Sequence, residues 1–297
     1  MILLQFDDWS IPTSGVSNST TRIQEVVMVI DQSHDWWLNK NGDLLHELSK
    51  QRIIRMDQET TPHCFPWTLI GLISHGLGSI NPKWLPISRT LHHFRDLLAN
   101  AYGDQNRPFV SRPPNARPRP RLVLARRRRG GRVMLNYVEV KHAMEEAGFE
   151  VIEFEPTKTT DLHQNYALLS SSHALLGVHG AALTHLLFLR PGSVLLQIVL
   201  IGQDGVAEFF GKPARELGLE YMEYKISVYE SSYMEKYGKD DLILNNSTAL
   251  LKDGWNRELY ELYIKYQDVK LDLTRFRPYL EKAYKKAEDF MDRLPQI

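Results

Sequence analysis

Short apolar runs alternate with stretches of helical pattern along the second half of this chain. Five segments, most of them rich in Leu, Val or Ile, read as strands. They cover residues 122–125, 150–154, 173–178, 193–200 and 220–226. The stretches with helical spacing between them cover residues 137–147, 161–171, 181–189 and 205–217. Strands that alternate with helices in this way predict an α/β fold with a doubly wound parallel sheet.

A turn of small residues follows the third run. Residues 177–184 read Gly-Val-His-Gly-Ala-Ala-Leu-Thr, and His179 alone brings a bulky side chain to the junction. Small side chains let a ligand approach the backbone, and the free N–H groups at the start of a helix over 181–189 favour an anion. A phosphate group is therefore the predicted ligand. The same small residues would equally let a helix pack closely on its sheet.

Positive charge is concentrated in residues 107–132, although 36 basic and 36 acidic residues balance in the whole chain. This segment is crowded with arginines and contains no acid. Its prolines, between 108 and 120, cannot continue a helix, so an extended linker is expected there with a domain boundary near residue 118. Phe109 is the only aromatic residue among the arginines before Leu122, and no nucleic-acid-binding motif surrounds them, so no nucleic-acid partner is expected.

Residues before the linker show a less regular α/β pattern, and the end of the chain reads as helices. The N-terminal strands are expected at 25–30 and 51–56, and the N-terminal helices at 36–48 and 91–102. The C-terminal helices are expected at 255–266 and 275–294, where apolar residues recur at helical spacing. These patterns predict three parts: an N-terminal domain of residues 1–118, a ligand-binding domain of residues 119–254 and C-terminal helices of residues 255–297 that pack back on the rest.

Several other features bear on the cellular compartment. The longest apolar stretch, residues 175–189, contains two histidines and is too short to cross a bilayer, and no signal segment follows Met1. Cys64 is the only cysteine, so no internal disulfide can form. Three asparagines begin N-glycosylation triplets, which matter only if the chain enters a secretory lumen. They are Asn18, Asn245 and Asn246.

Further motifs extend this pattern along the chain. They include Gly-Arg-Val-Met-Leu-Asn at 131–136, Ala-Gly-Phe-Glu-Val at 147–151, Phe-Leu-Arg-Pro-Gly at 188–192, Glu-Ser-Ser at 230–232, Gln-Asp-Val-Lys-Leu at 267–271 and Arg-Phe-Arg at 275–277. Together with the turn at 177–184, they resemble the plant branch of glycosyltransferase family 61, whose members include xylan arabinosyl- and xylosyltransferases. The resemblance covers roughly residues 26 to 285, and it is specific as an ensemble.

This resemblance implies a fold of two facing Rossmann-like domains, the GT-B arrangement, with a nucleotide-sugar donor held mainly by the C-terminal domain. It also implies inversion at the sugar carbon, no cofactor, no obligatory metal and residence in the Golgi lumen. Compared with the family, the N-terminal domain is incomplete and the membrane anchor and stem are missing. A truncated product is therefore expected, with membrane association only through that missing N-terminal anchor.

The resemblance and the chemistry of glycosyl transfer assign the donor site. Arg126 and Arg132 fall on the family's arginine positions, and each could offer a bidentate fork to phosphate oxygens. His179 and Thr184 could donate to a phosphate, while Asn136 could contact the ligand but is first expected to cap its helix. The expected donor-binding residues are Arg126, Arg132, Asn136, His179, Gly180, Ala181, Ala182 and Thr184. We expect Arg127, Arg128 and Arg129 to be solvated and His185 to be packed.

The predicted function is transfer of a pentose, arabinofuranose or xylose, from a UDP-sugar to a cell-wall polysaccharide such as xylan. Deprotonation of the acceptor needs a base, and the family's Gly-Asn-x-Phe-His segment has no counterpart here, so no catalytic residue is assigned. The alternative is a catalytically impaired remnant that binds a nucleotide or glycan. A dinucleotide-dependent oxidoreductase is disfavoured because arginines stand where a Gly-x-Gly-x-x-Gly turn would follow the first strand of the second domain.

Overall fold

The computed structural model describes residues 27–28, 35–48, 54–55, 58, 60–62, 75–76, 78–84, 88–103 and 119–294. The chain divides into two compact units: residues 1–106 with 157–166, and residues 107–156 with 167–297. Most of the predicted linker and the boundary at residue 118 lie outside the described residues, so the division into three parts stays a prediction. The C-terminal helices share the second unit with the sheet.

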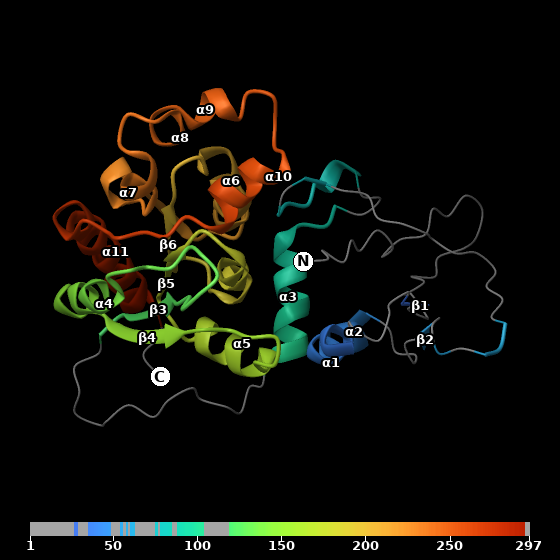
Figure 1. Cartoon of the computed structure of the whole chain (residues 1–297). Coiled ribbons are helices and arrows are strands. Elements are labelled where there is room, and N and C mark those ends of the chain that lie inside the picture. Colours follow the sequence, from blue (N-terminus) through green and yellow to red (C-terminus); the bar gives the residue numbers. More distant parts are fainter. Residues whose placement is uncertain are drawn as a thin grey trace. The chain divides into compact units, whose positions relative to one another are not determined.

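Five parallel strands form the sheet of the second unit, which confirms the predicted α/β class (Figure 1). They are β3 (Arg121–Ala125), β4 (Glu150–Phe154), β5 (Ala174–Val178), β6 (Val194–Val199) and β7 (Glu220–Lys225). Their order is β4-β3-β5-β6-β7, and each neighbouring pair is parallel. Because the order reverses between β3 and β5, the connections that follow these two strands leave toward opposite faces of the sheet.

One face of this sheet is covered by α4 (Tyr137–Glu146) and α11 (Leu273–Arg293), which contact each other. Even-numbered residues of β3, β5, β6 and β7 point into this layer, because successive side chains of a strand alternate between faces; in β4, whose Val151 pairs with Leu122, the odd-numbered residues do so. The buried cluster shared with α4 and α11 includes Leu122, Leu124, Ala174, Leu176, Val194, Leu196, Ile198, Met222 and Tyr224. The alternation predicts that residues 123, 125, 177 and 197 face the other layer.

That other layer contains η3 (Ala181–Phe188) and α6 (Asp204–Glu216), which contact each other. The predicted helix at 181–189 exists, but it is a 3₁₀-helix and not an α-helix. Thr184 Oγ1 donates to the Ala181 carbonyl at 2.7 Å, and His185 Nδ1 lies 2.9 Å from the Ala182 carbonyl. These bonds to the carbonyl three residues earlier suit the tighter 3₁₀ turn.

The longest described helix is α11, which begins after Asp272. The Asp272 carboxylate caps it by accepting the backbone N–H groups of Thr274 at 2.8 Å and Arg275 at 3.4 Å. Its buried residues recur at helical spacing and face the sheet; they are Phe276, Leu280, Ala283, Ala287 and Phe290. Among the described residues, no helix combines the length and the apolar character needed to cross a membrane.

Short helices fill the segment between β7 and α11. They are η4 (Val228–Glu230), α7 (Tyr233–Tyr237), α8 (Leu242–Asn245), α9 (Ser247–Leu250), α10 (Arg257–Tyr260) and η5 (Glu261–Lys265). The last of these is a π-helix that continues α10. The single predicted helix at 255–266 is therefore a short α-turn followed by a π-turn, a form often found at functional sites.

The first unit has its own small elements. Strands β1 (Val27–Met28) and β2 (Ile54–Arg55) pair in parallel, within the two predicted strands. The helices are α1 (Asp35–Lys40), α2 (Gly42–Leu48) and α3 (Leu91–Tyr102), with a 3₁₀ turn η2 (Pro82–Trp84) between the last two. The start of α5 (Leu162–Ser170) also belongs to this unit, where Asp161 Oδ1 accepts the N–H of His163 at 2.9 Å.

Candidate anion-binding site

The reversal of strand order between β3 and β5 marks the place where ligands bind in sheets of this kind. The loop after β3 carries the arginine cluster, and the turn after β5 carries His179 and Gly180. Both segments thus leave the carboxyl edge of the sheet from adjacent strands. The donor-binding residues assigned from the sequence lie in these two segments, and the sheet topology supplies the physical basis for bringing them together.

Arg132 lies against the turn after β5. Its Nη1 donates to the carbonyl oxygen of His179 at 3.2 Å, while its Nε is buried without a hydrogen-bond partner among the described residues. Burial first, and then the nearby charge of Arg127, lower the pKa of Arg132 to about 10, which still leaves it charged at neutral pH. The part of the chain that the structure describes offers Arg132 no carboxylate partner. A partly desolvated cation of this kind favours an anionic ligand.

Arg127 approaches the same turn. A Cβ built on Gly180 would lie 3.0 Å from Nη1 of Arg132 and 3.7 Å from Nη2 of Arg127. The backbone of Gly180 is extended, a conformation that any residue can adopt. Glycine is needed here because guanidinium atoms lie close to the position that a Cβ would take. Two guanidinium groups therefore converge where a side chain would otherwise stand.

The structure does not bring Arg126 to this turn, contrary to the expected convergence. Its Nη1 lies 2.6 Å from Glu153 Oε2, and its guanidinium carbon lies 4.1 Å from the centre of the Tyr137 ring. The side chain of Arg126 lies on the same face of β3 as Leu122 and Leu124, toward α4. The side chain of Arg127 lies on the opposite face, toward η3. The period-two alternation at the end of the strand was the signal in the sequence that could have found Arg127.

The other predicted loop arginines are solvent-exposed, as expected. Arg128 pairs with Glu155, Nε to Oε2, at 2.6 Å, and Arg129 is exposed.

Glycines shape the arginine loop itself. Gly130, Gly131 and Arg132 all have positive φ, and for Arg132 the value of 60° is unusual for a residue with a side chain. A Cβ on Gly131 would lie 2.0 Å from the Lys265 carbonyl oxygen, so this loop is pressed against the π-helix η5. The backbone is thereby fixed in the conformation that turns Arg132 toward Gly180.

Two of the family motifs pair with each other beside this loop. The N–H of Arg132 donates to Gln267 O at 3.1 Å, the N–H of Val269 to Val133 O at 2.9 Å, and the N–H of Leu135 to Val269 O at 2.7 Å. Residues 131–136 and 267–271 thus run side by side like two short strands, and their pairing supports the backbone on which Arg132 sits.

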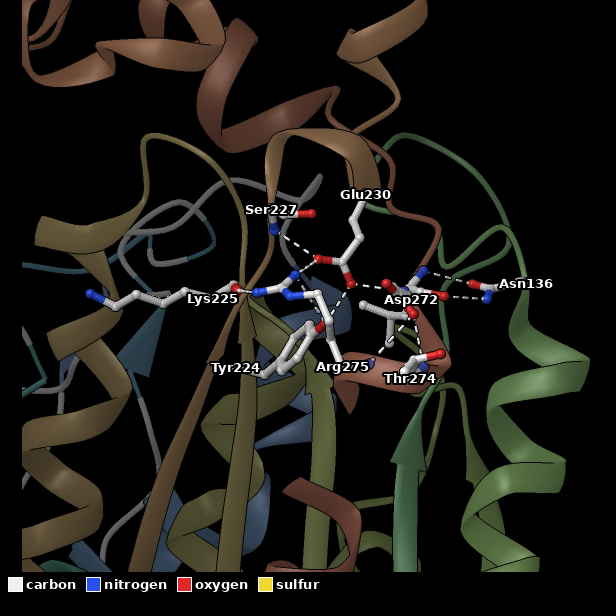
Figure 2. Close-up of polar contacts among 9 residues, drawn as sticks. Asn136, Tyr224, Lys225, Ser227, Glu230, Asp272, Thr274 and Arg275 are labelled. Atoms are coloured by element: carbon white, nitrogen blue, oxygen red, sulfur yellow. Dashed lines mark hydrogen bonds and ion pairs between the residues drawn. The ribbon is translucent and has the colours of Figure 1, made fainter. Parts of the chain in front are cut away.

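Asn136 belongs to this pairing rather than to the ligand side. It is buried, its Nδ2 donates to Leu271 O at 2.8 Å, and its Oδ1 accepts from Leu271 N at 2.9 Å. It stands at the N-cap position of α4, but its side chain makes no capping bond, so the expected cap is wrong. Both ends of the amide are used to hold the 267–271 segment (Figure 2).

His179 is a buried residue of the turn, 7% exposed. Its Nδ1 lies 2.8 Å from Gln197 Nε2, and its ring packs edge-on against Phe210 with 5.1 Å between centroids. Burial first, and then the charge of Arg132, lower the pKa of His179 to about 4. The imidazole is therefore neutral at physiological pH and contributes dipole and hydrogen bonding, not charge.

The start of η3 supplies backbone groups. Ala181 and Ala182 form its first turn, whose N–H groups have no earlier carbonyl within the helix to bond. Thr184 uses its hydroxyl proton on the Ala181 carbonyl, so as placed it has none left to donate to a phosphate. His185 packs edge-on between Phe154 and Phe188, with centroid distances of 4.9 and 5.6 Å, and is a packed residue as predicted.

The Glu230 carboxylate binds several segments together at the end of β7 (Figure 2). Its Oε1 accepts from Tyr224 Oη at 2.5 Å and from Asp272 N at 2.8 Å. Its Oε2 accepts from Ser227 N at 2.7 Å and pairs with Nη1 of Arg275. Glu230 is 2% exposed, so the motifs at 230–232 and 275–277 join the loop after β7 to the start of α11.

Two of the three predicted glycosylation sites lie within the described residues. Asn245 and Asn246 are exposed, and the Asn246 side chain caps α9 by accepting the N–H of Ala249 at 3.1 Å. Asn18 lies outside the described residues. No group of three or more His, Cys, Asp or Glu side chains in the described ranges is arranged to hold a metal ion.

Comparison with known proteins agrees with the motifs. Residues 56–196 match the family model for Glycosyltransferase 61. The chain is 37% identical over 295 residues to xylan glycosyltransferase MUCI21 of Arabidopsis thaliana, covering 95% of this chain and 59% of that protein. It is 36% identical over 278 residues to the beta-1,2-xylosyltransferase XAX1 of Oryza sativa subsp. japonica, covering 92% and 47%.

A third relative is the alpha-1,3-arabinosyltransferase XAT3 of Oryza sativa subsp. japonica, 33% identical over 263 residues, covering 87% of this chain and 45% of that protein. The chain thus spans about half the length of the curated relatives it matches. The family match, the identities of 33 to 37% over most of the chain and the motifs that line the site together show that the chain belongs to glycosyltransferase family 61.

Proposed function

We propose that this chain is a glycosyltransferase that moves a pentose from a UDP-sugar to a cell-wall polysaccharide such as xylan. The names of its relatives support xylosyl or arabinosyl transfer on xylan. The observation that carries the proposal is the convergence of Arg132 and Arg127 on Gly180 at the carboxyl edge of the sheet. That position is where a pyrophosphate would meet both guanidinium groups and the first turn of η3.

The chemistry explains why such a site is needed. When the bond between the sugar carbon and the β-phosphate oxygen breaks, its electron pair stays on that oxygen and UDP leaves with additional negative charge. Fixed cations and backbone N–H groups that face this charge stabilise the transition state more than the ground state. Arg132 and Arg127 can do this without a metal ion, so we propose a transfer that needs none and that inverts the sugar carbon.

The proposal also covers the arrangement of the domains and the cellular location. We propose the GT-B arrangement of the family, with the second unit as the donor side, and residence in the Golgi lumen, where Asn245 and Asn246 would be accessible to glycosylation. The acceptor hydroxyl has to lose a proton as it attacks the sugar. The base that takes this proton is not assigned to any residue of this chain.

Titration with UDP in a calorimeter tests the donor site. Arg132→Gly removes the guanidinium at a position whose φ of 60° glycine adopts without strain, so the change isolates the side chain. We expect UDP binding to weaken about 10- to 100-fold, the value of a charge-assisted hydrogen bond. Arg127→Gln should act in the same direction. Arg129→Gln, on an exposed loop position, is the matched control and should change little.

Product formation tests the reaction. Incubation with UDP-xylose or with UDP-arabinofuranose, and with xylan oligosaccharides as acceptors, should give pentosylated oligosaccharides detectable by mass spectrometry. UDP binding without any product would favour the alternative of a binding remnant. Unchanged UDP affinity in Arg132→Gly would contradict the proposed donor site.

A further inference from the structure

An exposed tyrosine lies next to the arginine loop. Tyr260, the last residue of α10, is 53% exposed. Within the described ranges, its side chain makes no hydrogen bond and contacts no other ring. Single exposed aromatic residues are common on protein surfaces, so it is the position of Tyr260, and not its exposure alone, that calls for an explanation.

Backbone contacts bring Tyr260 close to Arg132. The π-turn η5 follows Tyr260 directly, and within it the N–H of Tyr266 donates to the Glu261 carbonyl at 3.1 Å. A Cβ built on Gly131, the residue before Arg132, would lie 2.7 Å from the Cα of Tyr266. Burial and a neighbouring arginine lower the pKa of Arg132, while Tyr260 is near enough to act on this pKa in the opposite direction. An accessible aromatic ring thus lies beside the guanidinium of the candidate anion site.

The backbone on both sides of Tyr260 is fixed. Before it, Asn256 caps α10 by accepting the N–H of Leu259 at 2.8 Å, and the N–H of Tyr260 donates to Asn256 O at 2.9 Å. After it, the chain makes the π-turn, a rare form that is often found at functional sites. The ring is therefore carried on a pre-formed segment, which lowers the ordering cost of binding a ligand.

We propose that Tyr260 binds the uracil ring of the donor by stacking, next to the pyrophosphate that Arg132 and Arg127 hold. The proposal deepens the proposed donor site and rests on it for the identity of the nucleotide. It assigns a contact to the nucleoside end of the donor, which charge-binding groups such as the two guanidinium groups do not recognise.

The two ends of UDP differ in chemistry. The pyrophosphate takes charge-assisted hydrogen bonds, whereas the uracil ring has a flat π-face that aromatic side chains bind. One ribose joins the base to the phosphates, so the residue that stacks on the base has to lie close to the phosphate-binding residues. Tyr260 meets this condition. Tyr266 suits the role less well, because Lys265 Nζ lies 4.6 Å from the centre of its ring and covers one face.

Calorimetry with two probes separates the ends of the ligand. Tyr260→Ala removes the ring from an exposed position and should weaken UDP binding about 5- to 150-fold, the value of one base stacked on an aromatic side chain. Binding of inorganic pyrophosphate, which has no base, should stay as in the wild type. Tyr260→Phe keeps the ring and loses only the hydroxyl, so it should bind UDP like the wild type.

Tyr229→Ala is the matched control. Tyr229, in η4, is 67% exposed, and its side chain also has no hydrogen bond or ring contact in the part of the chain that the structure describes. Its replacement should leave both affinities unchanged. Full UDP affinity in Tyr260→Ala, or equal losses for UDP and pyrophosphate, would overturn the proposal. So would a loss in Tyr260→Phe as large as that in Tyr260→Ala.

The same titrations distinguish the base contact from the donor site on which it rests. If Arg132→Gly weakens UDP binding and Tyr260→Ala does not, the pyrophosphate site stands and the base contact fails. If only Tyr260→Ala weakens UDP binding, the base contact stands and the pyrophosphate site fails. If Tyr260→Ala keeps full UDP affinity but loses binding of xylan oligosaccharides, the ring belongs to the acceptor side and the proposal is wrong.

Discussion

At the scale of single residues, Arg132 carries two unfavourable features at once. A left-handed backbone costs an arginine about 1 to 2 kcal/mol relative to glycine, and its guanidinium is partly desolvated without a carboxylate among the described residues. Such features persist at functional sites, where the surrounding structure enforces them. At Arg132, the enforcing contacts are the bond to Gln267 and the close approach of Gly131 to η5.

Gly180→Ala is the sharpest test of the space above the turn. The added Cβ would lie 3.0 Å from Nη1 of Arg132, the far end of a flexible side chain, so the guanidinium moves and the backbone does not. We expect UDP affinity in calorimetry to fall about tenfold, while the free energy of unfolding changes by less than about 1 kcal/mol.

Gly205→Ala provides the control for this prediction. A Cβ at Gly205, in the first turn of α6, would meet nothing within 4 Å. This substitution should leave UDP binding unchanged and stabilise the protein slightly, because alanine is the better helix former. A Gly180→Ala protein that binds UDP like the wild type would show that the converging arginines do not form the site.

At the scale of elements, β3, β5 and η3 pack closely together at Gly177, which has no side chain to separate them. A Cβ at this position would lie 2.8 Å from the Cβ of Ala125 and 3.1 Å from Leu183 Cδ2. Gly177→Ala should therefore lower the free energy of unfolding in urea by about 1 to 3 kcal/mol, the usual cost of overpacking. In a double-mutant cycle, Ala125→Gly should recover part of that loss, and strictly additive effects would contradict the contact.

The start of α5 is joined to α2 by a histidine that titrates. His163 Nε2 lies 2.9 Å from Asp43 Oδ2, and its Nδ1 lies 3.2 Å from the Tyr102 carbonyl. Burial by itself lowers the pKa of His163, but the hydrogen bonds to Asp43 and Tyr102, with the charges of Asp43 and Asp161, outweigh it and raise the pKa above 6.5. The folded state thus binds this proton more tightly than the unfolded state.

The sign of the pH dependence follows from that difference. The stabilisation is fully present below pH 6.5 and is lost as the pH rises through the higher pKa of the folded state. Because both side chains are partly exposed, we expect less than about 1 kcal/mol. In Asp43→Asn, this loss of stability with rising pH should be absent. The measurement is the unfolding midpoint of both proteins between pH 6 and 9. An equal pH dependence in Asp43→Asn and the wild type would exclude the pair as its cause.

At the scale of the whole molecule, Glu230 connects segments that are far apart along the chain. Glu230→Gln replaces a buried carboxylate that accepts four bonds, and leaves Arg275 without its charge partner. We expect a loss of about 3 to 5 kcal/mol in the free energy of unfolding, measured in urea. Glu235→Gln, on an exposed position of α7, should change stability by less than about 0.5 kcal/mol. Similar losses in both variants would contradict this role.

Much of the second unit could be predicted from the sequence because its signals are short-ranged. Runs of four to eight residues with a strand pattern, together with glycine stops, identify the five strands and most helices without knowledge of their neighbours. The type of η3 could not be predicted in this way. Helical spacing over eight residues does not distinguish a 3₁₀-helix from an α-helix.

The candidate site was predicted less completely. The turn at 177–184 and Arg132 were found from small residues, charge and the family motifs. Arg127 was assigned to solvent and Arg126 to the ligand, because adjacent arginines look alike until the faces of β3 are known. Gln197 carried no signal at all, since a polar residue in an apolar strand does not reveal its partner on the next strand.

The sequence by itself determined the parallel α/β architecture, the two loops that carry polar chemistry and the family of the chain. Only the tertiary structure decided which guanidinium groups meet Gly180, that Asn136 binds Leu271, and that Gln197 reaches His179. The physical reason is range. Periodicity and turn chemistry act over a few residues, whereas the facing of side chains across strands depends on strand order and register, which no local pattern specifies.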